Sequence, residues 1–367
     1  MLILFFLSFI ISLVGAAMLI RNARGHARHY ADSMPQRFHA GDVPRLGGAA
    51  IFTAAGFGWL AVALQVQFGV PVNGNISFME VGQWVLVALP AVVGGCLEDV
   101  TQKVGVRYRL ILTTLSGALA CWLFQASIQR LGLWGIDTWW AAHPWLGVVL
   151  AMLAIGGLPH AFNIIDGYNG LAGIVALFIC FALIHVALQL GDRELAVWLV
   201  CLAGGTVGFL MWNYPRGLIF AGDGGAYTWG VLIAVASILL VQRHAEVSPW
   251  FPVLLLIYPV WETLFSIYRK AARGVSPGVA DALHFHQLIY RRIVRGVFHD
   301  DEARRMLMRN NRTSPYLWGF TMLSIAPAVL FWRSTPALMF FCALFVVSYV
   351  VFYVSIVRFK AQRWMRR

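Results

Sequence analysis

Apolar runs of about 20 residues recur along the whole of this chain, and they decide what it can fold into. A helix of that length crosses a hydrocarbon core about 30 Å thick. Because the runs are continuous and do not alternate with polar residues, they predict spanning helices and not the strands of a membrane barrel. The eleven runs cover residues 1–20, 46–69, 82–97, 109–127, 146–160, 171–190, 195–212, 219–241, 250–267, 316–332 and 337–357. The expected fold is an all-α, polytopic transmembrane bundle of about eleven spans.

The composition excludes an ordinary soluble protein. Of the 367 residues, 60% are hydrophobic and 12% are charged, whereas roughly a quarter of the residues of a soluble chain are charged. No stretch has the composition of a separate soluble domain, and the longest polar stretch, 268–315, is expected to be a loop. Residues 1–367 are therefore predicted to form one integral membrane domain in the lipid bilayer.

The basic residues predict the topology. With eleven spans the linkers alternate between two sides, and 24 of the 28 Lys and Arg residues fall on one side, counting Arg109 at the mouth of its span. The other side holds only Arg130, Arg193, Arg243 and Arg333. The positive-inside rule then places the basic side and the C-terminus in the cytoplasm and the N-terminus outside. The net charge of +12 is interpreted as this orientation signal, and no nucleic-acid partner is expected.

Acidic, amide and histidine side chains gather at the predicted cytoplasmic ends of the spans. They are Glu98, Asp99, Asn163, Asp166, Asn169, Asn213, Asp223, Asp281, His284 and His286. Carboxylates in such places serve either as caps solvated at the interface or as a site for a divalent cation and phosphate, because Mg²⁺ prefers oxygen ligands. Their concentration on one face favours the site for cation and phosphate.

Two segments at the ends of predicted spans carry charged residues that could bind a phosphate or a metal ion. Residues 41–48 bring Arg45 and a glycine pair to the mouth of the second span, where amides can approach an anion and Arg45 can clamp a phosphate. Glu98 and Asp99 end the third span, and the basic residues Lys103, Arg107 and Arg109 follow. This acidic pair is suited to hold a metal ion or accept a proton, and a mutual salt-bridge cluster is the alternative.

The segment 163–170 is dense in amides, acid and glycine between two apolar spans. If residues 163–166 form the last helical turn, Asn163 and Asp166 share one face. A simple turn between helices needs fewer such residues. The segment therefore indicates a site and not only a connection.

Asp223 opens the eighth span within the segment 220–225. A carboxylate beside the free amides of a helix start suits phosphate and metal together, and a plain N-cap is the alternative. In the long polar stretch, Asp281 precedes His284 and His286. Two histidines at i and i+2 are poor metal ligands from one helix face, but they suit contacts with a phosphate or a leaving group.

In this order the motifs resemble those of the polyprenyl-phosphate N-acetylhexosamine-1-phosphate transferases. The matching stretches are Pro-Arg-x-Gly-Gly at 44–48, an acidic pair at 98–99 with basic residues at 103 and 109, the Asn- and Asp-rich segment 163–171, the segment 213–225 and Asp-x-x-His-x-His at 281–286. The resemblance runs from about residue 35 to about residue 290. Three positions depart from the family pattern: Glu98, Asn169 and Glu262 each stand where the family has Asp.

The resemblance implies that the chain transfers a sugar phosphate. It implies attack of undecaprenyl phosphate on a UDP-N-acetylhexosamine, with Mg²⁺ or Mn²⁺ as cofactor, on the cytoplasmic face of a bacterial inner membrane. The implied catalytic residues are Glu98, Asp99, Asp166, His284 and His286. The implied substrate-binding residues are Arg45, Lys103, Arg109, Asn163, Asn169, Asn213 and Asp281, and Asp223 is the implied metal ligand. Direct attack and a covalent aspartyl-phosphate route both stay open.

One further residue bears on which sugar is transferred and for which pathway. Phe285 interrupts the three adjacent histidines of the branch that acts on the pentapeptide precursor of peptidoglycan. GlcNAc-1-phosphate transfer for O-antigen or a similar envelope glycan is therefore preferred over phospho-MurNAc-pentapeptide transfer. An ion-coupled transporter is the rival from another class, although transporters place ionisable groups near the membrane midplane. A homodimer is one alternative for the oligomeric state.

Overall fold

The computed structural model describes residues 1–27, 42–70, 74–274 and 283–358, and within these ranges all the regular structure is helical. The first seven long helices in chain order are α1 (Leu2–Ala27), α2 (Gly47–Gln67), α3 (Phe78–Thr101), α4 (Val106–Leu123), α6 (Pro144–Ile165), α7 (Leu171–Gln189) and α8 (Arg193–Asn213). They are followed by α9 (Gly222–Arg243), α11 (Ile257–Ala272), α13 (Glu302–Leu330) and α14 (Thr335–Val357). The short elements are α5 (Ile136–Ala141), α10 (Trp250–Leu255), α12 (Phe285–Leu288) and a π-helical turn at Ile289–Ile293. The all-α fold predicted from the apolar runs is confirmed.

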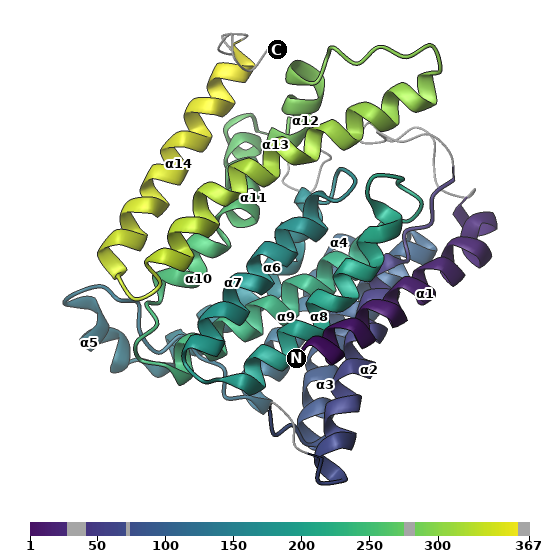
Figure 1. Ribbon diagram of the computed structural model, residues 1–367. Helices are drawn as coiled ribbons and strands as arrows, with labels where there is room; N and C mark the ends of the chain where they lie inside the picture. The colour runs from purple at the N-terminus through teal and green to yellow at the C-terminus, as the bar shows by residue number, and fades with distance from the viewer. Residues whose placement is uncertain (28–41, 71–73, 275–282, 359–367) are drawn as a thin grey trace.

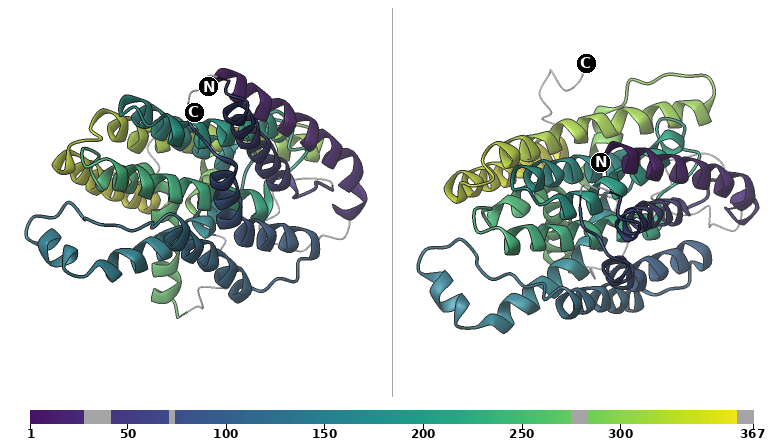
Figure 2. Two further views of the ribbon diagram at one scale, coloured as in Figure 1. Left: turned by 90° about the horizontal axis from the view of Figure 1, so that it is seen from below. Right: turned by 60° about the horizontal axis from the view of Figure 1, so that its bottom comes forward.

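Helix α9 lies at the centre of the bundle. Of its apolar window 94% is buried, against 28% for α1 and for α14, and α2, α3, α6 and α7 pack around it. Figure 1 shows α5 and α12 at opposite ends of the bundle, and Figure 2 shows α1 and α14 on its outside. A central helix apolar on every side is what a bundle of spanning helices requires.

Eight of the described helices are long and apolar enough to cross a membrane. They are α1, α2, α3, α6, α7, α8, α9 and α14. The multi-pass architecture is thereby supported, while the count of eleven spans and the direction of the termini stay predictions.

The run 250–267 is not one helix. It is divided at Leu256 into α10 and α11, because Pro259 has no N–H to donate to Leu255 and its ring crowds that carbonyl. The divided helix still leads toward the same end of the bundle as α12 (Figure 1).

The expected loop at 268–315 is largely wrong. Helix α11 continues to Ala272 and α13 begins at Glu302, where Asp301 caps it by accepting from the amides of Ala303 and Arg304. The charged first half of α13 hid the helix from an argument based on apolar runs. Helical caps and charge spacing, not hydropathy, carry the signal there.

Glycines let α2 and α3 approach the start of α9. A Cβ on Gly48 would lie 2.0 Å from the nitrogen of Gly225, and a Cβ on Gly95 would lie 2.6 Å from the nitrogen of Gly224. Both obstacles are backbone atoms, so no side-chain rotation relieves them. Glycine at 48 and 95 is therefore a packing requirement.

We expect Gly48→Ala and Gly95→Ala to lower stability by about 1–3 kcal/mol or more, because an extra methyl must push helices apart. The matched controls are Gly56→Ala in α2 and Gly82→Ala in α3, where a Cβ meets nothing within 4 Å. Those controls should be neutral or stabilising, since Ala is the better helix former by about 0.5–1 kcal/mol. The melting temperature of the purified protein in detergent measures both. Equal effects in the two pairs would contradict the close approach.

Candidate active site

The site is built on the start of α9, which the carboxylate of Asp99 holds in place. Asp99 is only 4% exposed, and its two oxygens accept from the amides of Asp223 and Gly224, each at 2.8 Å. Asp99 comes from the last turns of α3, so a carboxylate of one helix neutralises the positive end of another. The expectation that these two amides bind a phosphate is wrong, because Asp99 uses them.

Asp223 is the centre of the polar cluster. Its Oδ2 accepts from Nη1 of Arg109 at 2.5 Å and from the hydroxyl of Tyr227 at 3.2 Å. Its Oδ1 accepts from Nδ2 of Asn163 at 2.5 Å. Asp223 lies inside the first turn of α9, whose N-cap residue is Ala221, so the plain N-cap alternative does not hold. Helices α4, α6 and α9 thus meet at one carboxylate.

Tyr227 and His160 belong to this cluster although the sequence argument missed them. His160 lies between Tyr227 and Thr113. Its Nδ1 is 3.5 Å from the hydroxyl of Tyr227, and its Nε2 is 3.1 Å from the hydroxyl of Thr113. A helical signal was available, because Tyr227 is four residues after Asp223 and His160 is three before Asn163.

The glycine pair after Arg45 does not offer its amides to an anion. Gly47 and Gly48 donate to the carbonyls of Phe220 and Ala221, each at 2.9 Å, and Phe220 donates to the carbonyl of Pro44. The segment 44–48 therefore pairs with the segment 220–225 through backbone. The expectation that these glycines approach a phosphate is wrong, whereas a phosphate contact of the half-buried Arg45 stays a prediction.

Glu98 and Lys103 lie beside the cluster without joining Asp223. Oε2 of Glu98 accepts from the amide of Val104 at 2.7 Å, which shapes the turn between α3 and α4. Lys103 is exposed on that turn. Of the three basic residues that follow the acidic pair, it is Arg109 that pairs with an acid of the site, and that acid is Asp223.

Asp166 follows the last residue of α6 and faces the same cluster. Burial, followed by the charge of Asp223, raises the pKa of its carboxyl to about 7, and Arg45 opposes both effects. Two carboxylates thus converge where positive charge is insufficient, which is the situation that a divalent cation stabilises. Among the described residues no three His, Cys, Asp or Glu side chains form a cation cage. Mg²⁺ fits such a site, because it commonly uses one or two carboxylates with water and substrate phosphates.

Asn169 joins the segment after α6 to helix α13, and Asn213 joins the same segment to the one before α9. The amide of Asn169 donates to Oδ1 of Asn310, its Nδ2 donates to Oδ1 of Asn311, and its carbonyl accepts from Ser314. Oδ1 of Asn213 accepts from the amide of Gly170, and its Nδ2 donates to the carbonyl of Ile219. Both side chains are buried, so the structure shows them as loop clamps, and their contacts with substrate stay predictions.

His284 and His286 form a stacked pair beside the segment 163–170. Their rings lie 5.4 Å apart and within 4° of parallel, and both side chains are buried. A Cβ on Gly167 would lie 2.9 Å from Nε2 of His286, so this histidine packs on the residue after Asp166. Asp281 lies outside the described residues.

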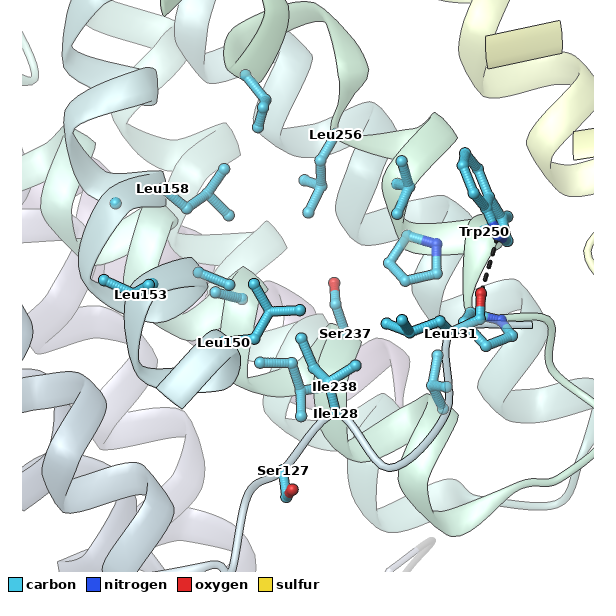
Figure 3. A pocket seen from close by; sticks show the side chains of 18 of the residues that line it. Ser127, Ile128, Leu131, Leu150, Leu153, Leu158, Ser237, Ile238, Trp250 and Leu256 are labelled. Carbon is cyan, nitrogen blue, oxygen red and sulfur yellow. Dashed lines mark hydrogen bonds between the residues drawn. The ribbon is translucent and has the colours of Figure 1, made fainter. Parts of the chain in front are cut away.

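An apolar cavity of about 630 Å³ lies elsewhere in the bundle. It is lined by α6, α9, α10 and α11 and by the segment 127–133, and its α6 wall reaches Leu158 and Ala161. Figure 3 shows Leu150, Leu153 and Leu158 on one side of it, with Trp250 and Leu256 across from them. Helix α6 thus lines this cavity along one part of its length and carries Asn163 of the polar cluster in its last turn.

Residues 81–241 match the model of glycosyl transferase family 4. The chain is 26% identical over 274 residues to the probable undecaprenyl-phosphate N-acetylglucosaminyl 1-phosphate transferase of Bacillus subtilis, which covers 72% of this chain and 69% of that protein. It is 25% identical over 258 residues to the undecaprenyl-phosphate alpha-N-acetylglucosaminyl 1-phosphate transferase of Thermotoga maritima. That similarity covers 70% of this chain and 72% of that protein. These similarities support a relation of the chain to glycosyl transferase family 4.

A second kind of relative is similar over a shorter stretch. The phospho-N-acetylmuramoyl-pentapeptide-transferase of Moorella thermoacetica is 32% identical over 169 residues, covering 46% of this chain and 50% of that protein. The family match contains Asp99, Asn163, Asp166 and Asp223. Arg45 and the histidine pair lie outside it.

The raised pKa of Asp166 predicts a pH-dependent cost to the fold. An ordinary Asp ionises near pH 4 when unfolded, so the unfolded chain loses its proton first, and stability falls as the pH rises from about 4 to about 7. We expect Asp166→Asn to melt at a higher temperature than the natural protein at pH 8 in EDTA, with the difference shrinking toward pH 5.

Asp300→Asn is the matched control, because it removes a carboxyl from an exposed position. It should change the melting temperature equally at both pH values. An Asp166→Asn protein that is not more stable at pH 8 would disprove the cost assigned to this carboxylate.

Proposed function

We propose that this protein transfers N-acetylhexosamine-1-phosphate, most simply GlcNAc-1-phosphate, from a UDP-sugar to undecaprenyl phosphate. The observation that carries the proposal is the convergence of Asp166 and Asp223 with Arg109 and Asn163, and an apolar cavity along α6 accompanies it. Such a site brings a charged phosphate and a long apolar chain to the same place. The names of the relatives agree with this chemistry.

In the proposed reaction, an oxygen of the lipid phosphate forms a bond to the β-phosphorus of the UDP-sugar. The bond from that phosphorus to the bridging oxygen breaks, its electron pair leaves with UMP, and a lipid-linked pyrophosphoryl sugar remains. A phosphate monoester is mostly dianionic at pH 7, since its second pKa is about 6, so the attacking oxygen needs little help from a base. Direct attack is therefore the simpler route. The main task of the protein is to bring two anions together.

The residues divide this task. Arg109 and Asn163 orient Asp223, and Arg45 supplies positive charge near Asp99 and Asp166. Asp99 acts by holding the start of α9, and it thereby fixes the backbone that carries Asp223. Lys103 and the histidine pair border the same end of the molecule and neutralise or position substrate phosphates, and Glu98 shapes the turn that carries Lys103.

Asp223, with Asp166 nearby, would hold Mg²⁺ or Mn²⁺. When bound, the cation neutralises charge on the diphosphate of the nucleotide sugar. The excess of carboxylate over positive charge at this point supports the assignment.

The apolar cavity takes the isoprenoid tail of the acceptor. Its walls of Leu and Ile side chains match a hydrocarbon (Figure 3), and we assign the phosphate head to the end of α6 that carries Asn163. The asymmetry of basic residues supports an inner-membrane protein whose site faces the cytoplasm, where nucleotide sugars are made. An envelope glycan such as O-antigen is the proposed product pathway.

Phospho-MurNAc-pentapeptide transfer is the second candidate, and the relative from Moorella thermoacetica favours it. Phe285 between the two histidines and the greater coverage of the GlcNAc-1-phosphate relatives favour the first candidate. UMP release with UDP-GlcNAc and with UDP-MurNAc-pentapeptide in parallel separates the two. Uptake of a UDP-sugar into vesicles without UMP release would instead support a transporter.

We expect Asp99→Asn and Asp223→Asn each to reduce Mg²⁺-dependent UMP release by about 10²–10³-fold or more. Asp223→Asn removes the preorganised negative charge of the site, and Asp99→Asn weakens the carboxylate that holds the start of α9. Membranes supplied with UDP-GlcNAc and undecaprenyl phosphate provide the assay. Glu194→Gln, which alters an ion pair with Arg243 away from the site, is the control. Full activity in either Asp variant with normal folding would rule out the assigned site.

We expect Gly157→Leu to raise the KM for polyprenyl phosphate while leaving the KM for the UDP-sugar within about twofold. Gly157 lines the cavity and a Cβ there meets nothing within 4 Å, so the larger side chain folds into the space for the tail. Gly56→Leu, on α2 and away from the cavity, is the matched control. A rise in the KM for the nucleotide sugar alone would place the lipid elsewhere.

A further inference from the structure

Glu262 is a fully buried carboxylate in α11, and three elements meet at it. Its Oε1 lies 3.0 Å from Nδ1 of His284 and accepts from the amide of Phe285 at 3.2 Å. Its Oε2 accepts from the hydroxyl of Tyr349 in α14 at 2.7 Å. A buried carboxylate is costly unless it is well hydrogen-bonded, so this arrangement has a purpose beyond filling space.

The contact with Glu262 determines which nitrogen of His284 carries a proton. A carboxylate only accepts hydrogen bonds, so Nδ1 must be the donor in either charge state of the imidazole. Nε2 is then the nitrogen that gains or releases a proton. The tautomer of a histidine is set in this way by the partner of its other nitrogen.

His284 in turn supports the residues next to the proposed site. Its ring stacks on His286, and His286 packs on Gly167, directly after Asp166. The series of contacts runs from α14 through α11 to the segment 163–170.

We propose that Glu262 and Tyr349 are positioning residues of the transferase that hold His284 in its Nδ1–H form and keep the His284–His286 pair against the Asp166 segment. The inference rests on the proposed function, and both residues lie outside the stretch that matches the family. Glu262 is one methylene longer than the Asp of the family pattern.

Other ionisable groups in this region are Tyr258 and Arg269, both on α11, and Tyr353 on α14. Arg269 donates to the carbonyl of Leu283 and to the hydroxyl of Tyr353, so it supports the chain just before His284. Tyr168 packs edge-on to His286. Among these groups, the carboxylate of Glu262 is the acceptor that reaches Nδ1 of His284.

The test combines kinetics with the ¹⁵N NMR spectrum of histidine-labelled full-length protein in detergent. The His284 signal is identified by its loss in His284→Gln. In the natural protein we expect a single Nδ1–H form, and in Glu262→Met a mixture of both tautomers with kcat lower by about 10- to 100-fold and little change in KM. Glu262→Gln retains an acceptor oxygen and should restore the Nδ1–H form and much of kcat.

Tyr349→Phe tests the same inference with a milder change, in case Glu262→Met does not fold. It removes one hydroxyl, and we expect kcat to fall about 10-fold. The matched control is Tyr258→Phe, because the hydroxyl of Tyr258 is also buried in α11 and has no hydrogen-bond partner among the described residues. It should leave kcat unchanged.

Two results overturn the inference. One is an unchanged Nδ1–H signal in Glu262→Met, and the other is a Tyr349→Phe protein with the kcat of Tyr258→Phe. If the natural protein releases no UMP from any UDP-N-acetylhexosamine, the proposed function fails, and the NMR result still decides the tautomer.

Discussion

The carboxylate of Asp99 at the start of α9 is the interaction on which the site depends. It satisfies two amides that a helix start otherwise leaves without an intrahelical partner, and it does so away from bulk water, where such bonds are strong. Because α9 is the most deeply buried of the candidate spans, fixing its first turn also fixes the position of Asp223 relative to the surrounding helices. One acidic side chain thereby serves the fold and the chemistry together.

That interaction requires a backbone approach that only glycine permits. The segment 44–48 pairs with 220–225, and Gly48 and Gly95 leave no room for a side chain against the start of α9. The glycine-rich motifs of this chain are therefore explained by the close packing of helices, which in turn positions the candidate site. Their amides bind carbonyl groups of the protein itself.

The carboxylates of the polar cluster differ in how their negative charge is balanced. Asp99 and Asp223 have several hydrogen-bond donors each, whereas the pKa of Asp166 is raised because burial and Asp223 outweigh Arg45. A protein that keeps such an imbalance gives up stability at a functional place. On the other side of Asp166, Glu262 and Tyr349 provide a fully bonded support for the histidine pair.

Sequence by itself predicted the all-helical fold, the multi-pass architecture, the family resemblance and most of the acids of the candidate site. Apolar length and the order of motifs are local properties, because the cost of placing a residue in hydrocarbon depends on that residue and its near neighbours. The partners of those acids were decided by tertiary structure alone. Asp99 and the amide of Asp223 are 124 residues apart, and Glu262 and Tyr349 are 87 apart, so no spacing rule joins them. A similar separation along the chain hides the hydrogen-bond partners of the glycine amides at 47–48 and of Asn169 from the sequence. Their hydrogen bonds go to Phe220, Ala221 and Asn310, which only the packed bundle brings near.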